Sequence, residues 1–120
     1  MSEEERPARI IVCGGRDYAD RERLFAALDA AHAKRPIGTV VHGGARGADS
    51  LGGEWAEARG VHIQVFAADW SEGRKAGPIR NQRMADAGAD ALIAFPGGRG
   101  TADMIRRAIA ARIVVWKPYG

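Results

Sequence analysis

Apolar residues along the chain fall into five short runs, and the longer stretches between them carry apolar residues at helical spacing. The runs predict strands at residues 9–13, 39–42, 61–66, 91–95 and 113–116. Strands that alternate strictly with helices form right-handed βαβ units and an open parallel sheet. The pattern therefore predicts the α/β class, as a single Rossmann-like three-layer domain with an open parallel five-stranded sheet.

The predicted helices have recognisable ends. Asp20 is expected to cap the first helix, Gly60 to stop the second, Pro78 to lie in the first turn of the third, and Gly88 to end it. In the fourth helix Met104, Ile105, Ala108 and Ile109 are expected to face inward. Residues 67–77 read as a polar connection, of a length that is often a functional lid. Residues 1–7 are expected to be a disordered tail, and residues 8–120 the domain.

One stretch, residues 91–103, organises the rest: a buried strand ends in Pro96-Gly97-Gly98-Arg99-Gly100-Thr101 and opens at once into a helix. The three glycines allow positive φ and let backbone N–H groups approach a ligand. Thr101 is expected to cap the helix, whose N-terminus favours an anion. These features predict a phosphate cradle, and the alternative is a tight turn with no ligand.

Two further glycine-rich loops follow predicted strands. They are Gly14-Gly15-Arg16-Asp17 after the first strand and residues 43–49, Gly-Gly-Ala-Arg-Gly-Ala-Asp, after the second. Ligands of open parallel sheets bind beyond the carboxyl ends of the strands, where the strand order reverses. All three loops are therefore expected at one edge of the sheet.

Composition narrows the function only slightly. The 120 residues are 46% hydrophobic and 28% charged, with 18 Lys and Arg against 15 Asp and Glu, a net charge of +3. This excess is too small to argue for nucleic acid, which is an unlikely partner. No apolar run is long enough for a membrane span, and a cytoplasmic protein is the simplest interpretation. Three histidines and one cysteine show no metal-ligand spacing, so we expect neither a metal nor another cofactor.

The motifs resemble one known group of proteins. Val41 to Asp49 resembles the GGARGxD loop of the DNA-processing protein A family. Arg80-Asn81, followed by residues 96–101, resembles the RN and PGGxGT pattern of the lonely-guy phosphoribohydrolases. The SLOG superfamily joins these families, and the chain from Ile10 to Trp116 looks closest to its YspA, cpYpsA-related branch. The resemblance implies a sensor or processor of nucleotide-derived ligands.

One departure from the resemblance concerns catalysis. The phosphoribohydrolases extend their motif to PGGxGTxxE, and that glutamate takes part in cleaving the N-glycosidic bond. Here the position is Met104, which transfers no proton and is expected in the core. The neighbouring Asp103 lies about 100° away around the helix, so it does not simply replace the glutamate. The catalytic residues are unknown, with Asp69, Asp103 and Arg80 as candidates.

Several side chains near the loops have two interpretations. Arginines could hold a phosphate bidentately or lie in solvent, and Asp17, Asp49 and Asp69 could accept hydrogen bonds from a ribose. Asp49 could instead cap the second helix, and Asn81 could read a base or tie loops together. Trp70 could stack on a base or pack on its own segment, whereas Trp55 and His42 are expected to be structural. The predicted ligand-binding residues are Gly14, Gly15, Arg16, Asp17, Gly43, Gly44, Arg46, Gly47, Asp49, Arg80, Asn81, Pro96, Gly97, Gly98, Arg99, Gly100 and Thr101.

Three functions follow from these predictions. The leading one is binding or sensing of a nucleotide or nucleotide-derived small molecule through the glycine loops. The second is a nucleoside-monophosphate phosphoribohydrolase, in which Asp69 or Asp103 supplies the carboxylate. The third is binding of single-stranded DNA, which ranks last because the chain has few aromatic residues and no evident basic stripe. A homo-oligomer such as a dimer is compatible with each of them.

Overall fold

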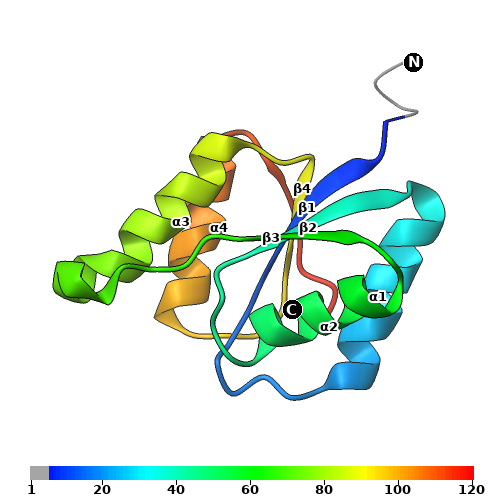
Figure 1. Ribbon diagram of the computed structural model, residues 1–120, viewed down its shortest axis with the longest axis horizontal. Helices are drawn as coiled ribbons and strands as arrows, with labels where there is room; N and C mark the ends of the chain where they lie inside the picture. The colour runs from blue at the N-terminus through cyan, green and yellow to red at the C-terminus, as the bar shows by residue number, and fades with distance from the viewer. Residues whose placement is uncertain (1–5) are drawn as a thin grey trace.

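The computed structural model describes residues 6–120 and has five parallel strands in one open sheet, in the order β3-β2-β1-β4-β5 (Figure 1). The elements are β1 (Ala8–Cys13), α1 (Arg21–Lys34), β2 (Ile37–His42), α2 (Ala48–Ala58), β3 (His62–Val65), η2 (Trp70–Lys75), α3 (Ala76–Ala87), β4 (Ala91–Ala94), α4 (Arg99–Ala110) and β5 (Val114–Trp116). The predicted fold class is confirmed. Of the expected tail, residues 1–5 lie outside the described part of the chain.

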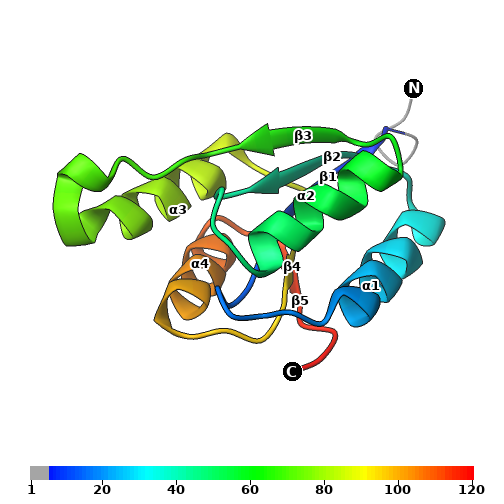
Figure 2. The same cartoon turned by 60° about the horizontal axis from the view of Figure 1, so that its bottom comes forward.

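Side chains of β1 alternate between the two faces of the sheet and define its layers. Ile10 and Val12 pack with buried residues of α1 and α2, whereas Ile11 and Cys13 pack with Met84 of α3 and with α4. Figure 2 shows α1 and α2 on one side of the sheet and α3 and α4 on the other. Both faces of the central strands are therefore covered, which explains why their sequences are continuous apolar runs.

Most of the predicted helix ends are found. The Asp20 side chain accepts a hydrogen bond from the Arg23 backbone N–H and caps α1. Gly60 and Gly88 follow α2 and α3 with φ of 68° and 81°, which glycine adopts readily. No helix within residues 6–120 is long and apolar enough to cross a membrane.

Two predictions about α4 are wrong. The helix begins at Arg99 after Gly98, so Thr101 is a buried residue of its first turn and does not cap it. Ile109 is 62% exposed. Residues Thr101, Met104 and Ala108 form the inward face, and Ile109 lies about 100° further around the helix, outside the packed stripe.

The expected connection of residues 67–77 is mostly helical. The 3-10 helix η2 occupies Trp70–Lys75 and α3 starts directly afterwards, which leaves only residues 67–69 and one non-helical glycine, Gly73. Asp69 caps η2: its Oδ1 accepts hydrogen bonds from the Ser71 N–H at 3.0 Å and the Ser71 hydroxyl at 2.6 Å. These bonds lower the pKa of Asp69. The carboxylate proposed for catalysis thus has a local structural partner.

Loss of Asp29 is expected to destabilise the contact between α1 and α2. Trp55 is fully buried and its indole N–H donates to Asp29 Oδ1 at 2.8 Å, while Arg59 contacts the same carboxylate with two nitrogens. Asp29→Ala should cost about 1–3 kcal/mol in chemical denaturation because the buried indole N–H loses its acceptor. Arg59→Ala removes the exposed ion pair and a cation–π contact with Phe25, and should cost much less. Equal losses in the two variants would mean that the ion pair is the important contact.

Candidate ligand-binding site at the carboxyl edge of the sheet

A pocket of about 570 Å³ opens at the carboxyl ends of β1 and β4. The chain runs from β1 outward to β2 and β3, and then returns to the other side of β1 for β4 and β5. The strand order therefore reverses between β1 and β4, which is where open parallel sheets bind ligands. Gly14, Gly15 and Arg16 line the pocket after β1, and residues 98–101 line it after β4.

Three helices begin at this pocket without a side-chain cap. Within residues 6–120, the N-termini of α2, α3 and α4 have no capping hydrogen bond from a side chain, in contrast to α1. The first turns of α3 and α4 also contain no acidic residue. The first N–H of α2 donates to the Gly15 carbonyl at 3.2 Å, and α3 continues directly from η2, with the Ala76 N–H donating to the Gly73 carbonyl. The N-terminus of α4 is therefore the open helix end, and such an end presents unpaired N–H groups and the positive end of the helix dipole. The pocket is accordingly suited to an anion.

The glycines after β4 do not use the positive φ that glycine allows. Gly97, Gly98 and Gly100 all have φ outside the positive range. A Cβ on Gly97 would collide with the Thr101 side chain and lie 2.6 Å from the Gly15 backbone nitrogen. Gly97 is thus required for the close contact of the two loops, which the Gly15 N–H also makes with the Pro96 carbonyl at 2.9 Å. Gly98 and Gly100 face open space.

The loop after β2 folds around a buried carboxylate. Asp49 Oδ2 accepts hydrogen bonds from the N–H groups of Gly43 at 2.9 Å and Ala45 at 3.3 Å. The helix begins at Ala48 with Gly47 before it, so Asp49 belongs to the first turn and does not cap α2. Burial raises the pKa of Asp49, and the hydrogen bonds and nearby positive charges offset only part of that rise. Asp49 therefore shapes the loop and also lines the pocket.

Arg80 is held on two sides. Its Nη1 donates to the Gly43 carbonyl at 2.5 Å and its Nε donates to Asn81 Oδ1 at 3.0 Å. Burial lowers the pKa of the guanidinium, while the nearby Asp49 opposes that shift. An arginine remains charged under such conditions. The result is a fixed cation at the pocket, joined to the loop after β2.

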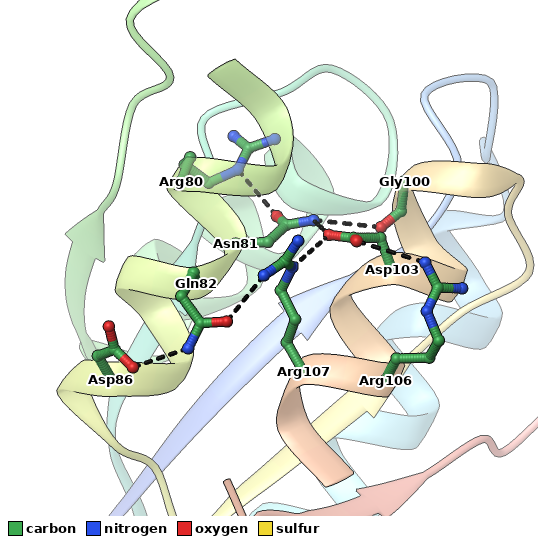
Figure 3. Close-up of polar contacts among 8 residues, drawn as sticks. All are labelled: Arg80, Asn81, Gln82, Asp86, Gly100, Asp103, Arg106 and Arg107. Carbon is green, nitrogen blue, oxygen red and sulfur yellow. Dashed lines mark hydrogen bonds and ion pairs between the residues drawn. The ribbon is translucent and has the colours of Figure 1, made fainter. Parts of the chain in front are cut away.

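A polar network connects α3 with α4 beside the pocket (Figure 3). Asn81 points from α3 and donates to Asp103 Oδ2 at 2.9 Å and to the Gly100 carbonyl at 3.3 Å. Asp103 also accepts from Arg107 Nε at 2.8 Å and from Arg106 at 3.4 Å. Burial alone would raise the pKa of Asp103, but these partners outweigh it and lower the pKa. Asn81 thus ties elements together, and Asp103 is an ionised, engaged carboxylate.

Three further side chains at or near the pocket, Met104, Cys13 and His42, have structural environments. Met104 is 1% exposed and packs in the core, as predicted, although part of it lines the pocket. Burial raises the pKa of the Cys13 thiol to about 12, so it stays protonated. His42 Nδ1 accepts the Gly44 N–H at 3.0 Å, and burial lowers its pKa, as expected of a structural histidine. Within residues 6–120, no three His, Cys, Asp or Glu side chains are grouped so that they could hold a metal ion.

A second, smaller pocket of about 380 Å³ adjoins the first. Arg16, Ala45 and Arg80 line both, and the smaller one adds Gly43, Gly44, Arg46, Ala67, Ala68 and Trp70. Trp70 is 59% exposed, and the Arg16 guanidinium carbon lies 5.4 Å from the centre of its ring. Arg46 forms an exposed ion pair with Asp17 at 3.4 Å. The two pockets therefore adjoin at Arg16, Ala45 and Arg80.

The structure brings most of the predicted site residues together. The larger pocket is lined by Gly14, Gly15, Arg16, Asp49, Arg80, Asn81, Gly98, Arg99, Gly100, Thr101 and Asp103, and the smaller one adds Gly43, Gly44 and Arg46. Five candidates line neither pocket within the described chain: Asp17, Gly47, Asp69, Pro96 and Gly97.

Sequence reasoning missed Arg106 at the larger pocket. Arg99, Asp103 and Arg106 are spaced by four and three residues, which places them on one face of α4. This spacing could have indicated from the sequence that Arg106 lies beside the other two residues. Cys13, Gly77, Pro78 and Met84 also line the pocket, and they became recognisable only when the fold placed them there.

The fold defines a Rossmann-like α/β protein with a pocket at the switch point of its sheet. Residues 8–73 match the profile of the YspA, cpYpsA-related SLOG family. The chain is also 42% identical over 116 residues to the Gene 61 protein of Mycobacterium phage D29, a match that covers 89% of this chain and 93% of the phage protein. The protein belongs to the YspA, cpYpsA-related SLOG family.

Proposed function

We propose that the protein binds a phosphorylated, nucleotide-derived ligand, with the phosphate at the N-terminus of α4. The observation that carries this proposal is the N-terminus of α4, which has no side-chain cap and no acidic residue in its first turn and lies at a pocket of about 570 Å³. Backbone N–H groups at such ends bind phosphate oxygens. Membership of the SLOG family agrees with a nucleotide-related ligand.

The charges of the pocket support the same class of ligand. Its lining includes four arginines, Arg16, Arg80, Arg99 and Arg106, against the two carboxylates Asp49 and Asp103. Asp103 is already bonded to Arg106 and Arg107, and Asp49 is bonded to backbone N–H groups. Arginine holds phosphate with two nitrogens at once. The excess of positive charge over these engaged carboxylates favours a ligand with at least one phosphate.

The glycine turn is the place to test this proposal. A nucleotide at one hundred times its Kd should stabilise the protein by about 2.7 kcal/mol. Gly98→Val should abolish that effect, because Gly98 lines the pocket and its Cβ would point into open space where the phosphate is expected. Differential scanning fluorimetry with the four ribonucleoside monophosphates, ADP and ribose 5-phosphate measures both proteins. Stabilisation that survives Gly98→Val would remove the phosphate from this turn, and no stabilisation by any probe would overturn the proposal.

Arg99 supplies a second test, based on charge. Arg99→Ala should weaken a phosphorylated probe by about 10- to 100-fold and leave its dephosphorylated nucleoside nearly unchanged, since a hydrogen bond to a charged group contributes about 1.5–3 kcal/mol. Lys34→Ala is the matched control, because it removes one exposed positive charge from the far end of α1. Equal weakening of nucleotide and nucleoside would assign Arg99 to loop structure.

We further propose binding without N-glycosidic cleavage. Met104 occupies the position of the family glutamate and cannot transfer a proton, and the Asp103 carboxylate accepts hydrogen bonds from three side chains. A general acid needs a proton near neutral pH, and the lowered pKa of Asp103 is unfavourable for that role. Chromatography of the unmodified protein with nucleoside monophosphates should therefore detect little or no free base. Rapid release that is lost in Asp103→Asn or Asp69→Asn would establish the phosphoribohydrolase instead.

A further inference from the structure

The smaller pocket has a composition that the phosphate site does not explain. We propose that it receives the planar base of the nucleotide, stacked on Trp70 in the place that the Arg16 guanidinium now occupies. The inference rests on the proposed function, because the phosphate of the same ligand lies in the larger pocket. Stacking of the base would give the site a preference for nucleotides over simple sugar phosphates.

Trp70 differs from the other two tryptophans in its position. Trp55 is fully buried and donates its N–H to Asp29, and Trp116 lies on the edge strand β5, at the opposite edge of the sheet from β3. Trp70 is 59% exposed at the start of η2, which follows β3 beyond the carboxyl end of the sheet (Figure 2). An exposed large aromatic side chain beside a hollow surface is a platform on which any nucleobase can stack.

The segment that carries Trp70 is anchored rather than loose. Asp69 caps η2 through the Ser71 N–H and hydroxyl, and Glu72 forms an ion pair of 3.8 Å with Arg83 of α3. These contacts fix the backbone on both sides of Trp70. The backbone that carries the indole ring is therefore held beside the pocket that Trp70 lines together with Gly43, Gly44 and Ala45.

The position of Arg16 shows how a base would enter. Its guanidinium carbon is 5.4 Å from the centre of the Trp70 ring, as in a cation–π contact. A base between the two groups would need roughly 7 Å, twice the optimal carbon–carbon contact of about 3.5 Å. The base must therefore replace the guanidinium. Arg16 also lines the larger pocket, so the displaced side chain can turn toward the phosphate.

The charge of the smaller pocket favours a phosphorylated aromatic ligand over a neutral one. Its charged lining residues are Arg16, Arg46 and Arg80, and within the described chain no carboxylate lines it. Arg46 is paired with Asp17, but both side chains are largely exposed, at 75% and 96%. Because Arg16 and Arg80 line both pockets, the two subsites are adjacent and share their cations. A ligand with a base linked through a sugar to a phosphate could place its base in the smaller pocket and its phosphate in the larger one.

The test compares AMP with ribose 5-phosphate, which carries the phosphate but lacks the base. Affinities are measured by titration calorimetry for the unmodified protein, Trp70→Ala and Trp70→Phe, with Trp116→Ala as the matched control for loss of an exposed tryptophan. Fluorescence is measured in a Trp116→Phe protein, in which Trp70 is the exposed indole and Trp55 is buried. Quenching by AMP then reports directly on Trp70.

We expect AMP to quench Trp70 and to bind about 5- to 100-fold more weakly to Trp70→Ala, the range for loss of one base–aromatic stack. Trp70→Phe should recover most of the affinity, Trp116→Ala should change nothing, and ribose 5-phosphate should bind all variants equally. If AMP and ribose 5-phosphate bind the unmodified protein equally and Trp70→Ala has no effect, the base site is wrong while the phosphate site stands. If neither probe binds, the proposed function fails, and this inference fails with it.

Discussion

Gly97→Ala should lower the free energy of unfolding by about 2–4 kcal/mol, even without any ligand. The new methyl group would collide with the Thr101 side chain and lie 2.6 Å from the Gly15 backbone nitrogen. A backbone atom cannot rotate away as the end of a long side chain can. The loop after β4 would therefore have to separate from the loop after β1. This movement would also lengthen the hydrogen bond from the Gly15 N–H to the Pro96 carbonyl. Urea denaturation followed by circular dichroism measures the loss.

The neighbouring glycine provides the control. Gly98→Ala places the same methyl group in open space, at a residue with φ of −102°. We expect its free energy of unfolding to stay within about 1 kcal/mol of the unmodified protein, as is usual for substitutions without a steric conflict. Similar losses in the two variants would mean that the turn is sensitive to any side chain, and that close approach at Gly97 is not the reason for its glycine.

Met104→Glu should also destabilise the protein strongly, by about 3–5 kcal/mol at neutral pH. Met104 is 1% exposed and packs with the buried residues of β1, β4 and α3. A carboxylate there would lose its hydration without gaining a hydrogen-bond donor or a cation in exchange. Met104→Leu keeps the volume and should cost less than about 1.5 kcal/mol. Thermal denaturation of the three proteins measures both values.

The pH dependence separates charge from packing. Burial would raise the folded-state pKa of the new carboxyl above its unfolded value of about 4.3. A group of this kind is least unfavourable below its unfolded pKa, and its cost grows as the pH rises through the folded pKa. The difference from the unmodified protein should therefore be larger at pH 8 than at about pH 4.5. A small loss at every pH would show that the carboxylate reaches the pocket and its arginines.

The fold could be predicted from the sequence because its signals are local. The apolar runs, the capping Asp20 and the glycines after α2 and α3 each act within a few residues. The expected inward position of Ile109 was wrong because the packed stripe of α4 is narrow, and an apolar residue at helical spacing does not show where that stripe ends. The helical form of residues 70–75 was missed because its cap, Asp69, precedes a segment without an apolar pattern.

The glycine loops of the site could be predicted because each is a local sequence motif. The residues that only the fold brings together could not. The three glycine loops were found because each follows a strand, and the pocket between two of them confirms that they meet. The roles of individual residues depend on contacts across the chain. Asp49 folds its own loop, Asn81 joins α3 to α4 through Asp103, and Gly97 serves loop packing rather than positive φ. The ligand and the roles assigned to it stay predictions.

The order of strands also determines when the site can form during folding. β1 is the first strand in the chain, yet its contact with β4 joins residues as far apart as Arg9 and Asp90, 81 positions along the sequence. Contacts of such high sequence separation carry a large loop-closure entropy and slow the folding reaction. The larger pocket exists only after this closure, because its two walls follow β1 and β4. A molecule bound across them would hold the ends of this long loop together and slow the unfolding of the whole sheet.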